Sequence, residues 1–206
     1  MNFDTDCTEE DIKAFQESYV YPLMPLLKNG VFHVTSIKGF RRIQQCDFII
    51  PNKGQFHCKH PQTKHYYGYS KGYICLFDFE SSNEQDYITN YLTWQHFFGD
   101  YEPFTIVLKL SRQKLADKLI PNSNPPQKVS EPEYKGFIPF VECWYPEKIP
   151  FSAIDSFIVV STNREKYVYE FEEFSKDEIA KLNQKLKPVE DSIKRLETLL
   201  QIEIID

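Results

Sequence analysis

The sequence contains no apolar run that approaches the ~18 residues of a membrane-spanning helix. Its first residues are acidic, and no basic segment followed by an apolar one is present, so no secretory signal peptide is predicted. The five cysteines are odd in number and scattered along the chain. They form no recognisable disulfide framework, which fits a reducing compartment. Together these absences predict a cytoplasmic protein.

Several binding motifs are also missing. No glycine-rich phosphate loop of the GxGxxG or P-loop type occurs. His57, Cys58 and His60 have the chemistry of zinc ligands, but no second pair follows at a matching spacing. We therefore predict no metal site. The net charge of -6 argues against non-specific binding to nucleic acid.

Aromatic residues, in contrast, are abundant, with 17 Phe and 13 Tyr among 206 residues. Such a load suits sheets, because aromatic rings pack well on a pleated surface. We predict an α+β domain in residues 1–172, with an N-terminal helix, and a C-terminal helical segment in residues 173–206. The expected strands cover 31–35, 48–50, 66–79, 104–110, 137–145, 154–161 and 166–171, and the expected helices cover 8–23, 36–46 and 84–98.

The C-terminal segment carries apolar residues at alternating steps of three and four, which is typical of a coiled-coil seam. The seam consists of Ile179, Leu182, Leu186, Val189, Ile193, Leu196 and Leu200. Pro188 interrupts it and is expected to start a second helix. Two interpretations stay open: a helix pair docked on the body, or a seam for a homodimer or a partner protein.

The most informative residue is Glu142, the single carboxylate in the apolar stretch 137–146. Burying an ionised carboxylate without partners is costly, so a cation, a hydroxyl or a ligand is expected to meet it. An ion pair with Lys148 or Arg164 is the simplest alternative to a ligand. A rival carboxylate, Glu133, follows a proline-rich loop and is expected to be solvated.

Three segments occur in a characteristic order: Val31–Ser36 with His33, Gly68–Ile74 with Tyr73, and Glu142–Pro146 followed by Ile149, Pro150 and Ile154. This ordered set resembles the ADP-ribosyltransferase superfamily, in its branch with a His, Tyr, Glu signature. The resemblance covers roughly residues 31–160. It implies two packed, mostly antiparallel sheets and NAD as the cofactor.

The resemblance further implies an enzyme, a glycosyltransferase that moves ADP-ribose from NAD to a protein or nucleic-acid acceptor and releases nicotinamide, as a toxin or an immune effector. Glu142 would bond the ribose hydroxyl and face the charge of an oxocarbenium-like transition state. His33 and Thr35 would hold the adenosine half of NAD. Tyr73 would stack on nicotinamide, a role for which Tyr67 and Tyr69 compete.

Two other functions remain open. The stretch 48–77 contains no acidic residue but several Lys and His, so residues 53–71 could steer a pyrophosphate or bind nucleic acid. Arg41, on the preceding helix, is a candidate phosphate contact. Alternatively, the chain is a catalytically inactive domain of the same fold that binds a partner through its heptad seam.

Overall fold

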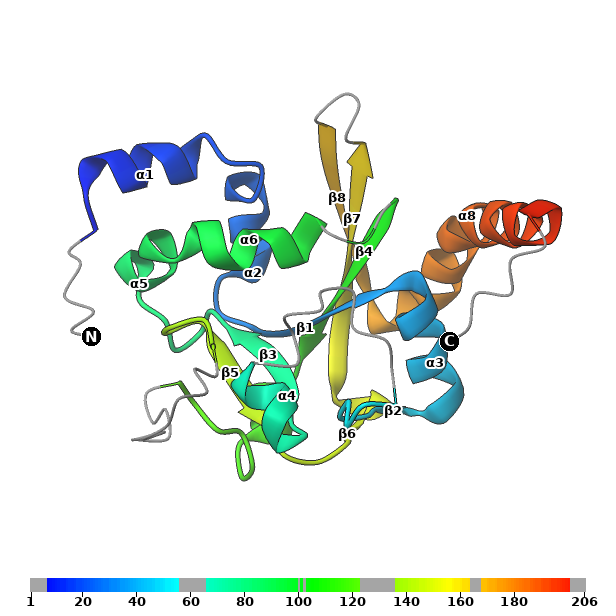
Figure 1. Cartoon of the computed structure of the whole chain (residues 1–206), viewed down its shortest axis with the longest axis horizontal. Coiled ribbons are helices and arrows are strands. Elements are labelled where there is room, and N and C mark those ends of the chain that lie inside the picture. The colour runs from blue at the N-terminus through cyan, green and yellow to red at the C-terminus, as the bar shows by residue number, and fades with distance from the viewer. Residues whose placement is uncertain are drawn as a thin grey trace.

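A six-stranded antiparallel sheet divides the fold into two helical layers (Figure 1). The structure is a computed structural model that describes residues 7–55, 66–99, 101, 103–122, 136–163 and 168–200. The strand order is β5-β3-β1-β4-β7-β8, and β2 and β6 form a separate two-stranded sheet. The strands are β1 (Val31–Ser36), β2 (Phe48–Ile49), β3 (Ile74–Asp78), β4 (Phe104–Leu110), β5 (Glu142–Tyr145), β6 (Ile149–Pro150), β7 (Ile154–Asn163) and β8 (Val168–Ser175).

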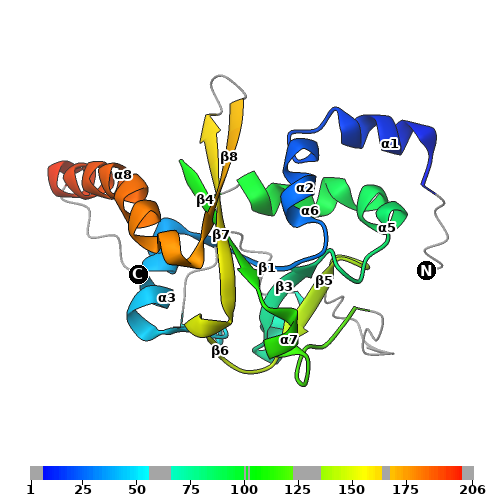
Figure 2. The same cartoon turned by 180° about the vertical axis from the view of Figure 1, so that it is seen from behind.

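The helices lie on both faces of this sheet, as the front and back views show (Figures 1 and 2). They are α1 (Glu9–Gln16), α2 (Met24–Leu27), α3 (Ile37–Cys46), α4 (Tyr67–Lys71), α5 (Glu84–Thr89), α6 (Tyr91–Gly99), α7 (Arg112–Leu115) and α8 (Ile179–Leu200). Short 3-10 turns cover Tyr21–Leu23, Phe151–Ala153 and Lys176–Glu178. The predicted α+β class is thus confirmed, but the second sheet is a short ribbon rather than a comparable layer.

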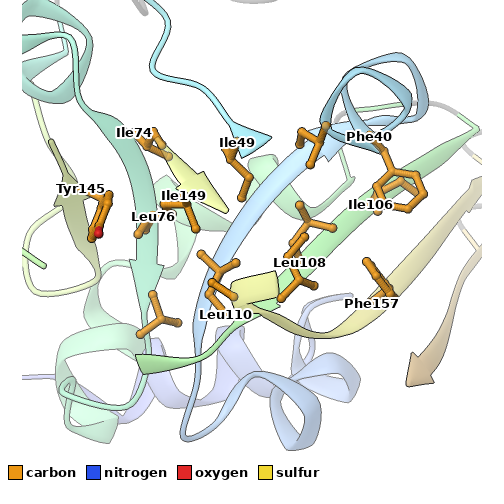
Figure 3. Packing of buried hydrophobic residues seen from close by; sticks show 14 of the residues in the cluster. Phe40, Ile49, Ile74, Leu76, Ile106, Leu108, Leu110, Tyr145, Ile149 and Phe157 are labelled. Carbon is orange, nitrogen blue, oxygen red and sulfur yellow. The ribbon is translucent and has the colours of Figure 1, made fainter. Parts of the chain in front are cut away.

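Alternation of side chains along the strands creates two cores. On one face, α3 and α8 cover a cluster that includes Phe40, Leu108 and Phe157 (Figure 3). Leu182 of α8 belongs to the same cluster. On the other face, α1, α2, α5 and α6 cover a cluster that includes Phe32. Because neighbouring residues of a strand point to opposite faces, membership of a cluster tells which way a strand side chain points.

Local signals that the sequence carried are present in the structure. Thr8 caps α1, at the start of the helix expected over 8–23, through a reciprocal capping box with Asp11. Ser36 caps α3, its side chain accepting a hydrogen bond from the Gly39 amide. β1 and β4 also form where their apolar patterns predicted them.

Two expected strands were too long. Residues 66–79 do not form one strand, because Tyr67–Lys71 is a helical turn that ends at Gly72 with a left-handed backbone. Residues 137 and 138 are irregular, residues 139–141 form a turn, and the strand begins only at Glu142. At both segments the apolar composition favoured a strand, but the structure has a turn over part of the predicted range.

The prediction of a second helix at Pro188 was wrong, because α8 runs unbroken from Ile179 to Leu200 with Pro188 inside it. The predicted boundary between residues 172 and 173 falls inside β8. The first half of α8 belongs to the core, since Leu182 and Leu186 are fully buried. The predicted proline-rich loop lies outside the described residues for positions 123–135.

Candidate functional site

The candidate site begins with the turn that leads into β5. Phe140 has a left-handed backbone, with φ of 62°, which is unusual for a bulky residue. Hydrogen bonds from several directions hold this turn: the Val141 amide donates to the Pro139 carbonyl, and the Glu142 amide donates to the Ile138 carbonyl. The Ser82 hydroxyl donates to the Phe140 carbonyl. The strained residue is therefore fixed by its surroundings, and its side chain is 45% exposed.

The Glu142 carboxylate completes this turn. Its Oε2 accepts a hydrogen bond from the Ile138 amide at 2.8 Å, and its Oε1 accepts one from the Trp144 indole at 2.9 Å. Only 5% of Glu142 is exposed. The alternative ion pair with Lys148 does not form, and the Lys148 ammonium lies over the Phe48 ring at 4.3 Å. Arg164, the other proposed cation, lies outside the described residues.

Burial and hydrogen bonding act on Glu142 in opposite directions. Desolvation is the larger effect and raises the pKa of the carboxyl above its ordinary value. Hydrogen bonds from the Ile138 amide, the Trp144 indole and the Cys75 thiol lower the pKa and offset part of that rise. The glutamate is thus buried as predicted, but protein donors meet both of its oxygens.

Aromatic rings surround this carboxylate and include one of the predicted site residues. The Tyr67 ring lies 4.8 Å from that of Trp144, and the Tyr73 ring lies 6.3 Å from that of Tyr67. The negative charge of Glu142 contributes to the raised pKa of the Tyr66 hydroxyl, after the larger effect of burial. Tyr73 is therefore connected to Glu142 by way of Tyr67 and Trp144, not by a direct contact.

Tyr69 lies on the same short helix, α4, and is partly buried. A Cβ added to Gly68 on this helix would overlap Cys75 and Trp144, so only glycine permits the helix to approach β3 and β5 this closely. The glycine-flanked segment thus places α4 over Trp144.

His33 and Thr35 lie on the opposite face of the sheet from Glu142. In the strand register, Phe32 pairs with Phe77, and Phe77 pairs with Glu142, so these three side chains share one face. His33 follows Phe32 and pairs with Leu108, which belongs to the other core. The structure therefore links Tyr73 to Glu142 through Tyr67 and Trp144, and it places His33 and Thr35 on the other face of the sheet.

His33 has an internal partner of its own. Its Nδ1 lies 3.3 Å from the Cys75 carbonyl, just beyond the point where the pairing of β1 with β3 ends at Phe32. The imidazole thus bonds the main chain of the neighbouring strand, β3. Desolvation lowers the pKa of His33 to about 4, and the bond to Cys75 raises it only in part, so the ring is neutral near pH 7.

Arg41 is engaged by the C-terminal helix. Its Nε and Nη2 donate to the two carboxylate oxygens of Glu190 at 2.6 and 2.7 Å. A further donor bonds the side-chain oxygen of Asn183. The predicted phosphate contact therefore joins α3 to α8 in this structure.

A second buried carboxylate escaped the sequence reasoning. Asp78 is 3% exposed and forms an ion pair with Arg112 at 2.7 Å. Asp78 stands at the end of the apolar strand β3, as Glu142 stands at the start of β5. A partner for this buried charge could therefore have been predicted as well. The contact between Trp144 and Glu142 could also have been predicted, because residues two apart on a strand point to the same face.

Comparisons with known proteins do not place this chain in a family: no family model, curated protein or solved structure matches it. No helix within the described ranges has the length and apolarity of a membrane span. Among the described residues, no three His, Cys, Asp or Glu side chains are grouped to hold a metal ion. His57, Cys58 and His60, and most of the basic stretch 53–71, lie outside the described residues.

Proposed function

We propose that this chain is an ADP-ribosyltransferase-like domain that works as a binding module. The observation that carries the proposal is the bonding of Glu142, whose two oxygens accept hydrogen bonds from the Ile138 amide and the Trp144 indole. A carboxylate that acts on NAD must face the sugar and the residues that hold it. Glu142 instead holds a turn and faces away from His33.

The contact element of the module is the second half of α8. Leu182 and Leu186 on its apolar stripe are buried against the body, whereas Ile193 and Leu196 on the same stripe are 40% and 58% exposed. Both views show this half extending beyond the sheet and its covering helices (Figures 1 and 2). A helix end without tertiary packing is marginal in water, so a partner that covers the stripe would stabilise it.

The partner we propose is a second copy of this chain. Around a twofold axis, Ile193 of one copy packs against Leu196 of the other, so an aliphatic stripe is self-complementary. The charges beside the stripe are balanced, with Asp191 and Glu197 against Lys194 and Arg195. Two copies therefore meet without strong net repulsion. Because only about two helical turns are available, the dimer is expected to be weak.

Sedimentation velocity over a range of protein concentrations tests this partner. The wild type is expected to dimerise as its concentration rises. Leu196→Asp is expected to remain monomeric, with the thermal midpoint that the wild type has at dilutions where it is also monomeric. Leu92→Asp is the matched control, because Leu92 is 62% exposed on α6, away from the stripe. A wild type that stays monomeric at every concentration contradicts the proposal.

A second candidate function is NAD-dependent ADP-ribosyl transfer. It is favoured by the row of aromatic contacts from Tyr73 through Tyr67 to Trp144, whose indole bonds a carboxylate of raised pKa, since perturbed groups concentrate at functional sites. In this case Glu142 would have to exchange its internal donors for the ribose hydroxyl. Release of nicotinamide from NAD separates the two functions.

A further inference from the structure

Two lysines converge on one backbone carbonyl, that of Ser152. The Lys114 ammonium, on α7, donates to the Ser152 carbonyl at 2.7 Å, and the Lys176 ammonium donates to the same oxygen at 3.0 Å. The two nitrogens are therefore no farther apart than 5.7 Å, the sum of these distances. Two like charges are held together by three separate segments of chain.

The position of this lysine pair is fixed by the backbone. Ser152 lies in the 3-10 turn Phe151–Ala153, and the Ser111 amide before α7 donates to the Ala153 carbonyl at 2.8 Å. The Lys176 ammonium also lies 6.0 Å from the Phe151 ring centroid. Leu115 of α7, Ala153 of the turn and Phe174 near the end of β8 are buried. The backbone segments that carry the two lysines therefore belong to the packed body and need little rearrangement for the lysines to act together.

Neither ammonium is neutralised by a carboxylate among the described residues. Other lysines in this part of the chain are paired: Lys118 with Glu147, Lys181 with Glu178 and Lys185 with Glu172. Glu173, on β8 before Lys176, accepts from the Ser156 hydroxyl. The Ser152 carbonyl is a dipole and cannot balance two positive charges.

Each ammonium has three N–H donors and gives one to Ser152, so donors remain on both lysines. Ser152 and Lys114 are exposed, so solutes can reach the pair. An oxyanion with several acceptor oxygens satisfies both lysines at once and removes their mutual repulsion. We propose that Lys114 and Lys176 form a binding site for a phosphate group, either free or carried by a phosphorylated molecule.

Isothermal titration calorimetry of the full chain with inorganic phosphate, at constant ionic strength, tests this site. Saturable binding at a single site is expected, and it weakens roughly fivefold or more in Lys114→Gln and in Lys176→Gln, the loss typical of one charged contact. Lys118→Gln is the matched control and retains wild-type affinity. A parallel titration with phenyl phosphate separates the sources, because a site for phosphorylated molecules binds the ester at least as tightly as the free ion.

The second measurement is pH dependence. A phosphate monoester gains its second negative charge near pH 6, so its affinity for two ammonium groups should rise from pH 5.5 to pH 7.5. The proposal is overturned if the wild type shows no saturable phosphate binding. It is equally overturned if Lys114→Gln and Lys176→Gln bind phosphate as tightly as Lys118→Gln does.

Discussion

At the scale of single residues, Glu142 is a structural carboxylate. It joins the turn before β5 to the indole of Trp144, and it lies under α4 with Tyr66 and Tyr67 nearby. The turn places Phe140 in a left-handed conformation that costs roughly 1–2 kcal/mol for an ordinary residue. The bond from the Ile138 amide to Glu142 helps to hold that conformation.

Replacing Glu142 should therefore destabilise the protein. Glu142→Ala leaves the Ile138 amide and the Trp144 indole buried without acceptors, at about 1–3 kcal/mol for each group. Glu142→Gln keeps one acceptor oxygen and should cost less. Urea denaturation measures the free energy of unfolding, and Glu147→Ala, which removes an exposed surface pair, is the control. Equal free energies of unfolding for Glu142→Ala and Glu147→Ala would show that the Glu142 carboxylate does not stabilise the turn.

His33 predicts a loss of stability in acid. Its folded pKa, about 4, lies below its ordinary value of 6.5, so the unfolded chain binds the proton more readily. The stabilising effect of the neutral ring is complete above pH 6.5 and is lost as the pH falls towards 4. Denaturation at intervals across this range should show a steeper decline for the wild type than for His33→Gln. Parallel curves for the two proteins contradict a partly buried imidazole of lowered pKa.

The sequence allowed the burial of Glu142 to be predicted but not its partners. A lone carboxylate in an apolar stretch had to be satisfied, and it is. One of the donors, however, is a backbone amide in a turn. Every residue except proline has such an amide, so the residue types do not indicate which amide will point towards Glu142. The separation of His33 from Glu142 depends on register, because a shift of one residue exchanges the faces of a strand.

At the scale of elements, the C-terminal helix is the main departure from expectation. Pro188 predicted a break, because proline removes one helical hydrogen bond and crowds the preceding turn. The helix nevertheless continues, since Leu182 and Leu186 anchor one side of the proline and Arg41 bonds Glu190 on the other. Here the tertiary contacts of α8 outweigh the preference of Pro188 against the interior of a helix.

The Arg41–Glu190 pair should therefore determine how firmly α8 is held. Arg41→Ala leaves Glu190 and Asn183 without this guanidinium, and the partly buried pair should cost about 1–3 kcal/mol. Hydrogen exchange of amides beyond Pro188 should accelerate in this variant. Arg195→Ala, on the exposed part of α8, is the control and should leave exchange near Glu190 unchanged. Protection unaffected by Arg41→Ala would mean that other contacts hold the helix.

Capped helices and well-patterned strands were the elements that the sequence specified best. Thr8 and Ser36 supply hydroxyl caps, and the apolar runs of β1 and β4 have strand length. The segment with Gly68 and Gly72 was harder, because tyrosines favour strands while the two glycines permit a helical turn and its left-handed end. Composition alone does not decide between these outcomes.

At the scale of the whole molecule, one sheet keeps two sets of residues apart. Glu142 and Trp144 lie on one face, and His33 and Thr35 lie on the other. The order of the three segments along the chain supports the proposed ADP-ribosyltransferase-like class, while the faces on which they lie favour binding over NAD cleavage. α8, which extends from the body, gives such a module a contact surface.

The most direct test is the release of nicotinamide from NAD by the folded wild type and by Glu142→Gln, whose folding circular dichroism checks. We predict that both proteins release nicotinamide only at the rate of the buffer, with and without candidate protein or nucleic-acid acceptors. A wild type that consumes NAD, and loses that activity in folded Glu142→Gln, would contradict the account and establish the transferase.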